Sequence, residues 1–91
     1  MNWLARVHVV LKPVVNDPPG RAISGGLHSL GFTNVEQVRA GKYFEITLGA
    51  ATETEARASI DEMCRKLLAN PVIEDFRLEV EAVRPPADPN G

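Results

Sequence analysis

The sequence predicts an α+β domain whose elements follow one another in the order β-α-β-β-α-β. Runs rich in β-branched and aliphatic residues recur near the start, middle and end of the chain, and two stretches with helical periodicity separate them. This order is the split βαβ arrangement, in which two helices cover one face of an antiparallel sheet. Ninety-one residues suffice for one domain. We expect that domain over residues 1–83 and a mobile, Pro-rich tail over residues 84–91.

The first strand is expected over residues 3–12, where apolar residues alternate with more polar ones. One face of this strand carries Trp3, Ala5, Val7, Val9 and Leu11. The other face, with Arg6 and His8, is the wetter one. Pro13 ends the pairing, because proline has no N–H to donate to a ladder.

A helix follows the turn at residues 16–20. Asp17 is a suitable N-cap, and proline at the next position loses no helical hydrogen bond. One apolar stripe of this helix is formed by Ile23, Leu27 and Leu30. Gly31 fits the left-handed position that commonly ends a helix.

Two strands are expected next, over residues 35–39 and 43–48, as a hairpin. The turn between them is Ala40-Gly41-Lys42, with Gly41 in the left-handed conformation. Val35 and Val38 do not alternate, so the first of these strands should be short, bulged or at a sheet edge.

The second helix is expected from Thr52 to Asn70, opened by a capping box of Thr52 and Glu55 and closed before Pro71. Its core face comprises Ala56, Ile60, Met63, Cys64 and Leu67. A last strand over residues 72–83 turns Phe76, Leu78 and Val80 to one face.

Composition and charge exclude several classes of protein. Ten Lys and Arg against twelve Asp and Glu give a net charge of −2, without the basic excess of a nucleic-acid binder. One cysteine forms no internal disulfide. No apolar run approaches the roughly 20 residues of a membrane helix. The first residues lack the pattern of a secretory signal, so we expect a cytoplasmic protein.

No catalytic, metal or cofactor site is expected in this chain. His8, His28 and Cys64 lack metal-ligand spacing, and Cys64 lies on the apolar stripe of a helix, where a thiol packs as a small hydrophobe. Glu74 and Asp75 point to opposite faces of a strand and form no dyad. No phosphate-binding loop is present. Two alternatives stay open: an RNA-recognition-like domain and an amino-acid-binding regulatory module of the ACT type, which share the strand order.

Three segments together resemble the PurS family, the small subunits of phosphoribosylformylglycinamidine synthase. They are the strand and turn VVLKPVVNDPPG at 9–20, VRAGKYFEI at 38–46 and MCRKLLANPVIEDF at 63–76. The resemblance implies a non-catalytic subunit in purine biosynthesis that joins a large synthetase subunit to a glutaminase subunit. It also implies that ATP and Mg bind at the large subunit, that no cofactor binds this chain, and that the chain forms a homodimer or tetramer.

The resemblance and the charge pattern together select candidate interface or family-motif residues. They are Lys12, Asp17, Gly20, Arg39, Gly41, Lys42, Asn70 and Glu74. Arg39 and Lys42 place two cations at the tip of the expected hairpin in an otherwise acidic chain. We therefore expect these two to meet an acidic patch on a partner subunit.

Overall fold

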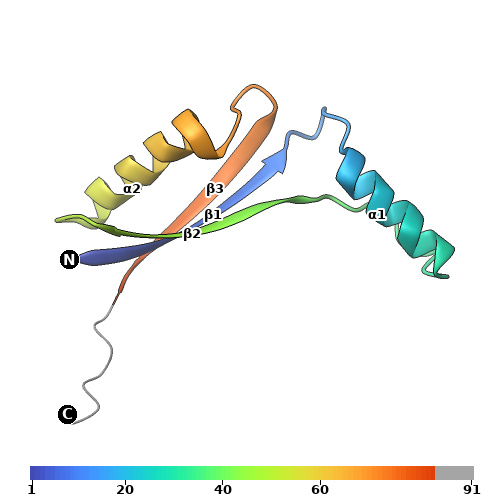
Figure 1. The fold of residues 1–91 in the computed structure, drawn as a ribbon, viewed down its shortest axis with the longest axis horizontal. Coiled ribbons are helices and arrows are strands. Elements are labelled where there is room, and N and C mark those ends of the chain that lie inside the picture. The colour runs from blue at the N-terminus through green and yellow to red at the C-terminus, as the bar shows by residue number, and fades with distance from the viewer. Residues whose placement is uncertain (84–91) are drawn as a thin grey trace, which may run out of the picture.

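The structure is a computed structural model, and it describes residues 1–83. Its sheet has three antiparallel strands, with β1 (Asn2–Leu11) between β2 (Gly41–Gly49) and β3 (Glu74–Ala82). Helix α1 (Pro18–Ser29) connects β1 to β2. Helix α2 (Glu53–Met63) and a π-helical segment (Cys64–Leu68) connect β2 to β3, as Figure 1 shows. The α+β class and the antiparallel sheet are therefore as predicted.

The core lies on the face of the sheet that α2 covers. Alternation along β1 buries Trp3, Ala5, Val7 and Val9, as the sequence pattern predicted. Ile60 and Cys64 of the helical connection pack against this row and are fully buried. The Trp3 indole Nε1 donates a hydrogen bond to the Ala50 carbonyl at 3.0 Å, which ties β1 to the end of β2.

The start of α2 follows the predicted capping box. Thr52 Oγ1 accepts the backbone N–H of Glu55 at 3.1 Å. The Glu55 carboxylate accepts the N–H of Ala51 at 3.2 Å, one residue before the cap. The N–H of Glu55, one of the backbone donors that a helix start leaves unpaired, thus finds an acceptor, and the Glu55 side chain fixes the residue before the cap.

The end of this helical stretch differs from the prediction of one regular helix to Asn70. After Met63 the helix widens, and the Ala69 N–H donates to the Cys64 carbonyl five residues earlier, at 2.9 Å. The widened turn rotates later side chains, so that Leu68 packs against the core while Leu67 is 83% exposed. The prediction that Leu67 lies on the core face is therefore wrong.

The predicted strand at residues 35–39 and its hairpin are also wrong. In the described chain, residues 32–40 pair with no strand, and Gly41 is the first residue of β2, without a positive φ. Both edges of β1 are occupied by β2 and β3, so the irregular Val35–Arg39 segment has no place beside the central strand. The exposed sheet edges are β2 and β3.

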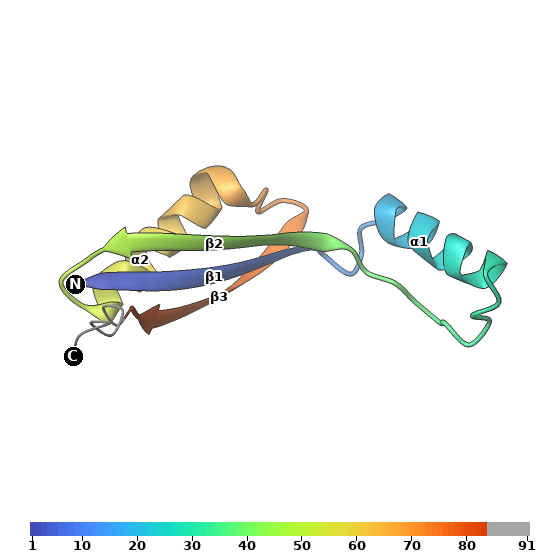
Figure 2. The ribbon, with the colours of Figure 1, turned by 60° about the horizontal axis from the view of Figure 1, so that its bottom comes forward.

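Helix α1 does not cover the sheet, contrary to the prediction of two helices on one face. It projects beyond the end of the sheet where β1 ends, and the segment after it returns along the same side, as Figures 1 and 2 show. Its only buried residue is Gly20. The radius of gyration is 17.8 Å, against about 12 Å for a compact domain of this length. Asp17 and Gly31, which has φ of 100°, do bound α1 as predicted.

Within the described residues, no helix has the length and apolar character needed to cross a membrane. The predicted tail at 84–91 lies outside the residues that the structure describes.

Candidate functional site

The eight candidate residues gather at one end of the sheet, where β1 ends and where β2, β3 and α1 begin. Six of them form two groups. One group is a polar network beside the end of the π-helical segment, formed by Lys42, Asn70 and Glu74. We call it the sheet-end network. Asp17, Gly20 and Arg39 join the base of α1 to the start of β2, and we call this group the α1 clamp.

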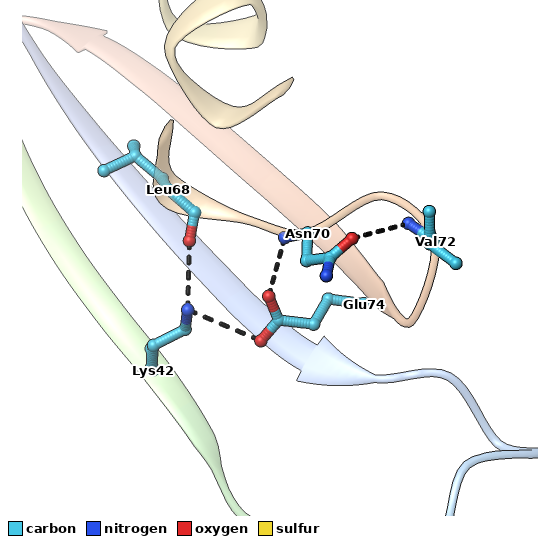
Figure 3. A network of polar contacts seen from close by, with 5 residues as sticks. All are labelled: Lys42, Leu68, Asn70, Val72 and Glu74. Carbon is cyan, nitrogen blue, oxygen red and sulfur yellow. Dashed lines mark hydrogen bonds and ion pairs between the residues drawn. The ribbon is translucent and has the colours of Figure 1, made fainter. Parts of the chain in front are cut away.

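The sheet-end network forms because the apolar rows of the two edge strands end in charged residues. Lys42 continues the row of Phe44, Ile46 and Leu48 on β2, and Glu74 continues the row of Phe76 and Leu78 on β3. The Lys42 Nζ lies 3.4 Å from the Glu74 carboxylate and donates to the Leu68 carbonyl at 3.1 Å (Figure 3). The Glu74 side chain is 15% exposed.

Asn70 fixes the turn that leads into β3. Its backbone N–H donates to the Glu74 carboxylate at 2.7 Å, and its side-chain oxygen accepts the N–H of Val72 at 3.1 Å (Figure 3). Its carbonyl accepts the N–H of Glu74 at 2.7 Å. The Glu74 carboxylate therefore connects β2, the end of the helical stretch and β3.

We expect Lys42→Met to lower the free energy of unfolding by about 1–2 kcal/mol, because the largely covered Glu74 carboxylate and the Leu68 carbonyl both lose their donor. Urea denaturation measures this. Lys66→Met is the matched control, since its exposed pair with Glu62 one helical turn away is worth about 0.5 kcal/mol at most. Equal losses in the two variants would contradict a structural role for Lys42.

The α1 clamp centres on the Asp17 carboxylate. One oxygen accepts the N–H of Gly20 at 2.9 Å, and the other accepts the N–H of Ala40 at 3.0 Å. The first bond caps α1, and the second attaches the returning chain just before β2. Asp17 is the one buried charged residue of the described chain. These two backbone donors, with a smaller contribution from Arg39, lower the pKa of the Asp17 carboxyl below its ordinary value.

The clamp should weaken in acid. A lowered folded-state pKa stabilises the fold above the ordinary pKa of 3.8, and this contribution is lost as pH falls through the folded-state value. We expect Asp17→Asn to reduce stability at neutral pH and to flatten its decline in acid, because an amide has one acceptor oxygen for two donors. Urea midpoints at neutral and acid pH test this, with Asp75→Asn, a loosely paired exposed carboxylate, as control. A decline as steep as that of the parent chain would contradict it.

Two glycines allow close backbone approach at this end of the sheet. A Cβ on Gly20 would lie 2.3 Å from the Val38 carbonyl oxygen, and one on Gly41 would lie 2.4 Å from that of Val9. Gly41 is therefore required for strand contact and not for the left-handed turn that the sequence suggested.

Arg39 and Lys42 do not form a free cationic tip. The Arg39 guanidinium donates to the Leu11 carbonyl at the end of β1, and Lys42 reaches Glu74 and Leu68. Lys12 lies 3.8 Å from Asp75 at the start of β3. The expectation that Arg39 and Lys42 lie at the tip of a hairpin was wrong, because residues 32–40 form no strand and Lys42 lies within β2.

Sequence reasoning selected the charged side chains of the site but missed their partners. These include backbone groups: the N–H of Ala40 and the carbonyls of Leu11 and Leu68. Backbone groups carry no sequence signal. Only Gly20, a glycine just inside a predicted helix, hinted at a close contact.

The site has little capacity for chemistry of its own. A groove of about 410 Å³ beside the base of α1 is open and polar. Its lining includes two arginines and two carboxylates, of Arg21, Arg39, Asp17 and Glu36. Burial raises the pKa of the Cys64 thiol, which makes it a poor nucleophile. Among residues 1–83, no three His, Cys, Asp or Glu side chains gather in a metal-binding group. The geometry is that of a structural joint.

Comparison with known proteins decides the family. The family model described as PurS, phosphoribosylformylglycinamidine (FGAM) synthase, matches residues 4–82. The chain belongs to the PurS family. It is 46% identical to the PurS subunit of FGAM synthase from Synechocystis, over 90% of this chain and 82% of that protein. The chain is thus a subunit of FGAM synthase, an enzyme of purine biosynthesis, which favours the PurS interpretation over the ACT and RNA-recognition alternatives.

Solved PurS structures share the fold. The Bacillus subtilis PurS structure aligns with a TM-score of 0.80 at 45% identity, over 88% of this chain and 99% of that one. A chain in the structure of PurLQS from Thermotoga maritima aligns with a TM-score of 0.82 at 25% identity, over 89% and 99%. The three-stranded sheet with two helices is therefore the PurS fold.

Proposed function

We propose that this chain is the non-catalytic subunit that joins the synthetase and glutaminase subunits of FGAM synthase. In that role it lets ammonia released from glutamine convert formylglycinamide ribonucleotide and ATP to the amidine. The match to the PurS family over residues 4–82 carries the proposal. The fold shared with a chain of the Thermotoga PurLQS structure supports a place beside PurL and PurQ.

The proposal assigns the cofactors to other chains. ATP and Mg bind at the large synthetase subunit, and this chain binds none. Residues 1–83 act as one unit, and the enzyme works in the cytoplasm. The eight residues at the sheet end contribute by holding α1 and the edge strands in a fixed arrangement. A partner subunit then binds to this arrangement.

The need for such a subunit follows from the chemistry of ammonia. In neutral water ammonia becomes mostly ammonium, which is no nucleophile. Two active sites that share ammonia must therefore be held in a closed relation that excludes water. The chain offers three surfaces for this purpose, the two sheet edges and the projecting helix α1 (Figure 2). Each of them is able to contact a neighbouring subunit.

The proposal also includes a homodimer or tetramer. Few side chains are fully buried, and large apolar residues of α1 and the following segment are exposed, among them Ile23, Leu30 and Phe32. A small domain with so thin a core is commonly completed by association.

Reconstitution tests the proposal. FGAM synthase activity is measured with purified synthetase and glutaminase subunits, with and without this chain, using either glutamine or ammonium as the nitrogen source. We expect glutamine-dependent turnover to require the chain and to saturate with it, whereas ammonium-dependent turnover depends on it less. The chain alone should give no turnover. Full glutamine-dependent activity without the chain would overturn the proposal.

A further inference from the structure

Two arginines without an ionic partner line the groove beside the base of α1. The chain has ten Lys and Arg, and nine of them lie in residues 1–83, since the tenth is Arg84. Seven of these nine lie 2.5–3.8 Å from a carboxylate. The two that pair with no carboxylate of residues 1–83 are Arg21 and Arg39, and both line this groove. The positive charge that the described chain leaves uncompensated is therefore gathered at one place.

Each of the two guanidinium groups is already held by one hydrogen bond. Arg21 donates to the side-chain oxygen of Asn16 at 3.0 Å, and Arg39 donates to the Leu11 carbonyl. A guanidinium has five N–H donors, so both retain donors for a further acceptor. A side chain that is already held loses less conformational entropy when it binds a ligand. The two arginines are thus a prepared pair of cationic donors.

The carboxylates of the groove do not neutralise this pair. Both oxygens of the buried Asp17 are engaged, one by the N–H of Gly20 and the other by the N–H of Ala40. Glu36 is exposed and forms no ion pair within residues 1–83. The groups that remain available to a ligand are therefore two guanidiniums and one carboxylate.

The start of α1 does not itself bind an anion. Pro18 and Pro19 have no N–H. The next two backbone donors both bind Asp17: the N–H of Gly20 donates to its carboxylate at 2.9 Å, and the N–H of Arg21 donates to its carbonyl at 2.9 Å. The free donors that a helix start normally offers are thus already used. Any anion in the groove must be bound by the arginine side chains.

The size and the other polar groups of the groove indicate the class of ligand. Its volume of about 410 Å³ lies within the roughly 300–1,000 Å³ of small-molecule sites. Arg21 and Ser24 line it from α1, and Glu36, Gln37 and Arg39 line it from the segment that returns beside α1 (Figure 2). A phosphate monoester carries a charge of about −1.5 to −2 and three acceptor oxygens, which suits two guanidiniums. A free carboxylate suits hydroxyl donors.

We propose that the groove binds a ribose phosphate, with the phosphate between Arg21 and Arg39 and the sugar hydroxyls donating to Glu36. Such a ligand contacts both α1 and the returning segment, and so stabilises the α1 clamp by mass action. The groove holds no reacting group, so the ligand acts on the position of α1 and not on a reaction. This inference goes beyond the proposed function, in which the chain serves only to join other subunits.

Calorimetric titration of the full chain tests the site with three probes: ribose 5-phosphate, inorganic phosphate and ribose. We expect saturable binding of ribose 5-phosphate at one site per chain, about fivefold tighter than inorganic phosphate, and no binding of ribose. Arg21→Gln should weaken both phosphate probes about tenfold or more. Arg21 is the residue to change, because Arg39 also belongs to the α1 clamp. Arg57→Gln is the matched control, since Arg57 is an exposed helical arginine already paired with Glu53, and it should leave binding unchanged.

Glu36→Ala separates the sugar from the phosphate. The variant should bind ribose 5-phosphate no more tightly than inorganic phosphate, because the sugar hydroxyls lose their acceptor. Its affinity for inorganic phosphate should not fall, because a negative charge has been removed from the groove. Ribose 5-phosphate should also raise the urea midpoint of the parent chain and not that of Arg21→Gln. Circular dichroism checks that each variant keeps its helices and sheet.

The outcomes are distinct from those of the reconstitution assay, because binding is measured on this chain alone. Absence of saturable binding, or equal binding by the parent and Arg21→Gln, would overturn the site. If the parent binds no phosphate probe and Arg21→Gln lowers glutamine-dependent turnover of the reconstituted enzyme, the arginines bind a carboxylate of a partner subunit, and the ribose phosphate site is likewise overturned. Failure of the parent chain to support reconstitution would overturn only the proposed function.

Discussion

Replacing Ile60 by alanine is expected to lower the free energy of unfolding by about 2–5 kcal/mol. Ile60 is fully buried, and it is the largest side chain by which α2 contacts the central row of β1. The chain has few other buried side chains to compensate. Because small domains have total stabilities of about 5–15 kcal/mol, the variant should unfold at a much lower urea concentration.

Urea denaturation at a fixed protein concentration measures this effect, since association makes the midpoint depend on concentration. Val72→Ala removes a branched side chain that is 79% exposed, and it should change stability by no more than about 0.5 kcal/mol. A loss below about 1 kcal/mol in Ile60→Ala would mean that α2 does not hold the sheet together.

Gly20→Ala should lower stability by about 1–3 kcal/mol, although alanine is normally the better helix residue. The added Cβ would meet the Val38 carbonyl oxygen at 2.3 Å and the Asp17 carboxylate at 2.8 Å. The base of α1 must then shift, which breaks the bonds from Asp17 to Gly20 and Ala40. We expect weaker self-association as a second consequence.

Gly25→Ala is the matched control in the same helix. Nothing lies within 4 Å of a Cβ at this position, and the residue faces away from the Ile23–Leu30 stripe. The substitution should stabilise the chain by about 0.5–1 kcal/mol, because alanine loses less backbone entropy than glycine. Sedimentation and urea unfolding of both variants provide the comparison. Stabilisation by Gly20→Ala would contradict a close contact between Gly20 and the Val38 carbonyl.

Elements whose local signals agree with one another were predictable from the sequence. The strict alternation along β1 predicted its buried face, and the pairs Asp17–Pro18 and Thr52–Glu55 predicted where both helices begin. Each signal acts within a few residues, so no knowledge of the tertiary structure was needed.

The errors arose where distant contacts decide the structure. The valines at 35 and 38 suggested a strand, but a strand forms only beside a partner, and β1 already has two. The position of α1 depends on hydrogen bonds between Asp17 and Ala40, which are 23 residues apart. The widened turn at Cys64–Leu68 contains one more residue than a regular helical turn, and this rotates Leu67 out of the core. Periodicity alone does not indicate such a turn.

The central position of β1 bears on how the polypeptide folds as it leaves the ribosome. Trp3 pairs with Leu48 on one side and with Ala82 on the other. The first strand made is therefore half paired once β2 emerges, and its second edge stays open until β3 is synthesised. Contacts between residues so distant in sequence slow folding and leave an unpaired strand edge exposed meanwhile. Nascent chains of this protein should therefore be most prone to misassociation in the interval between synthesis of β2 and synthesis of β3.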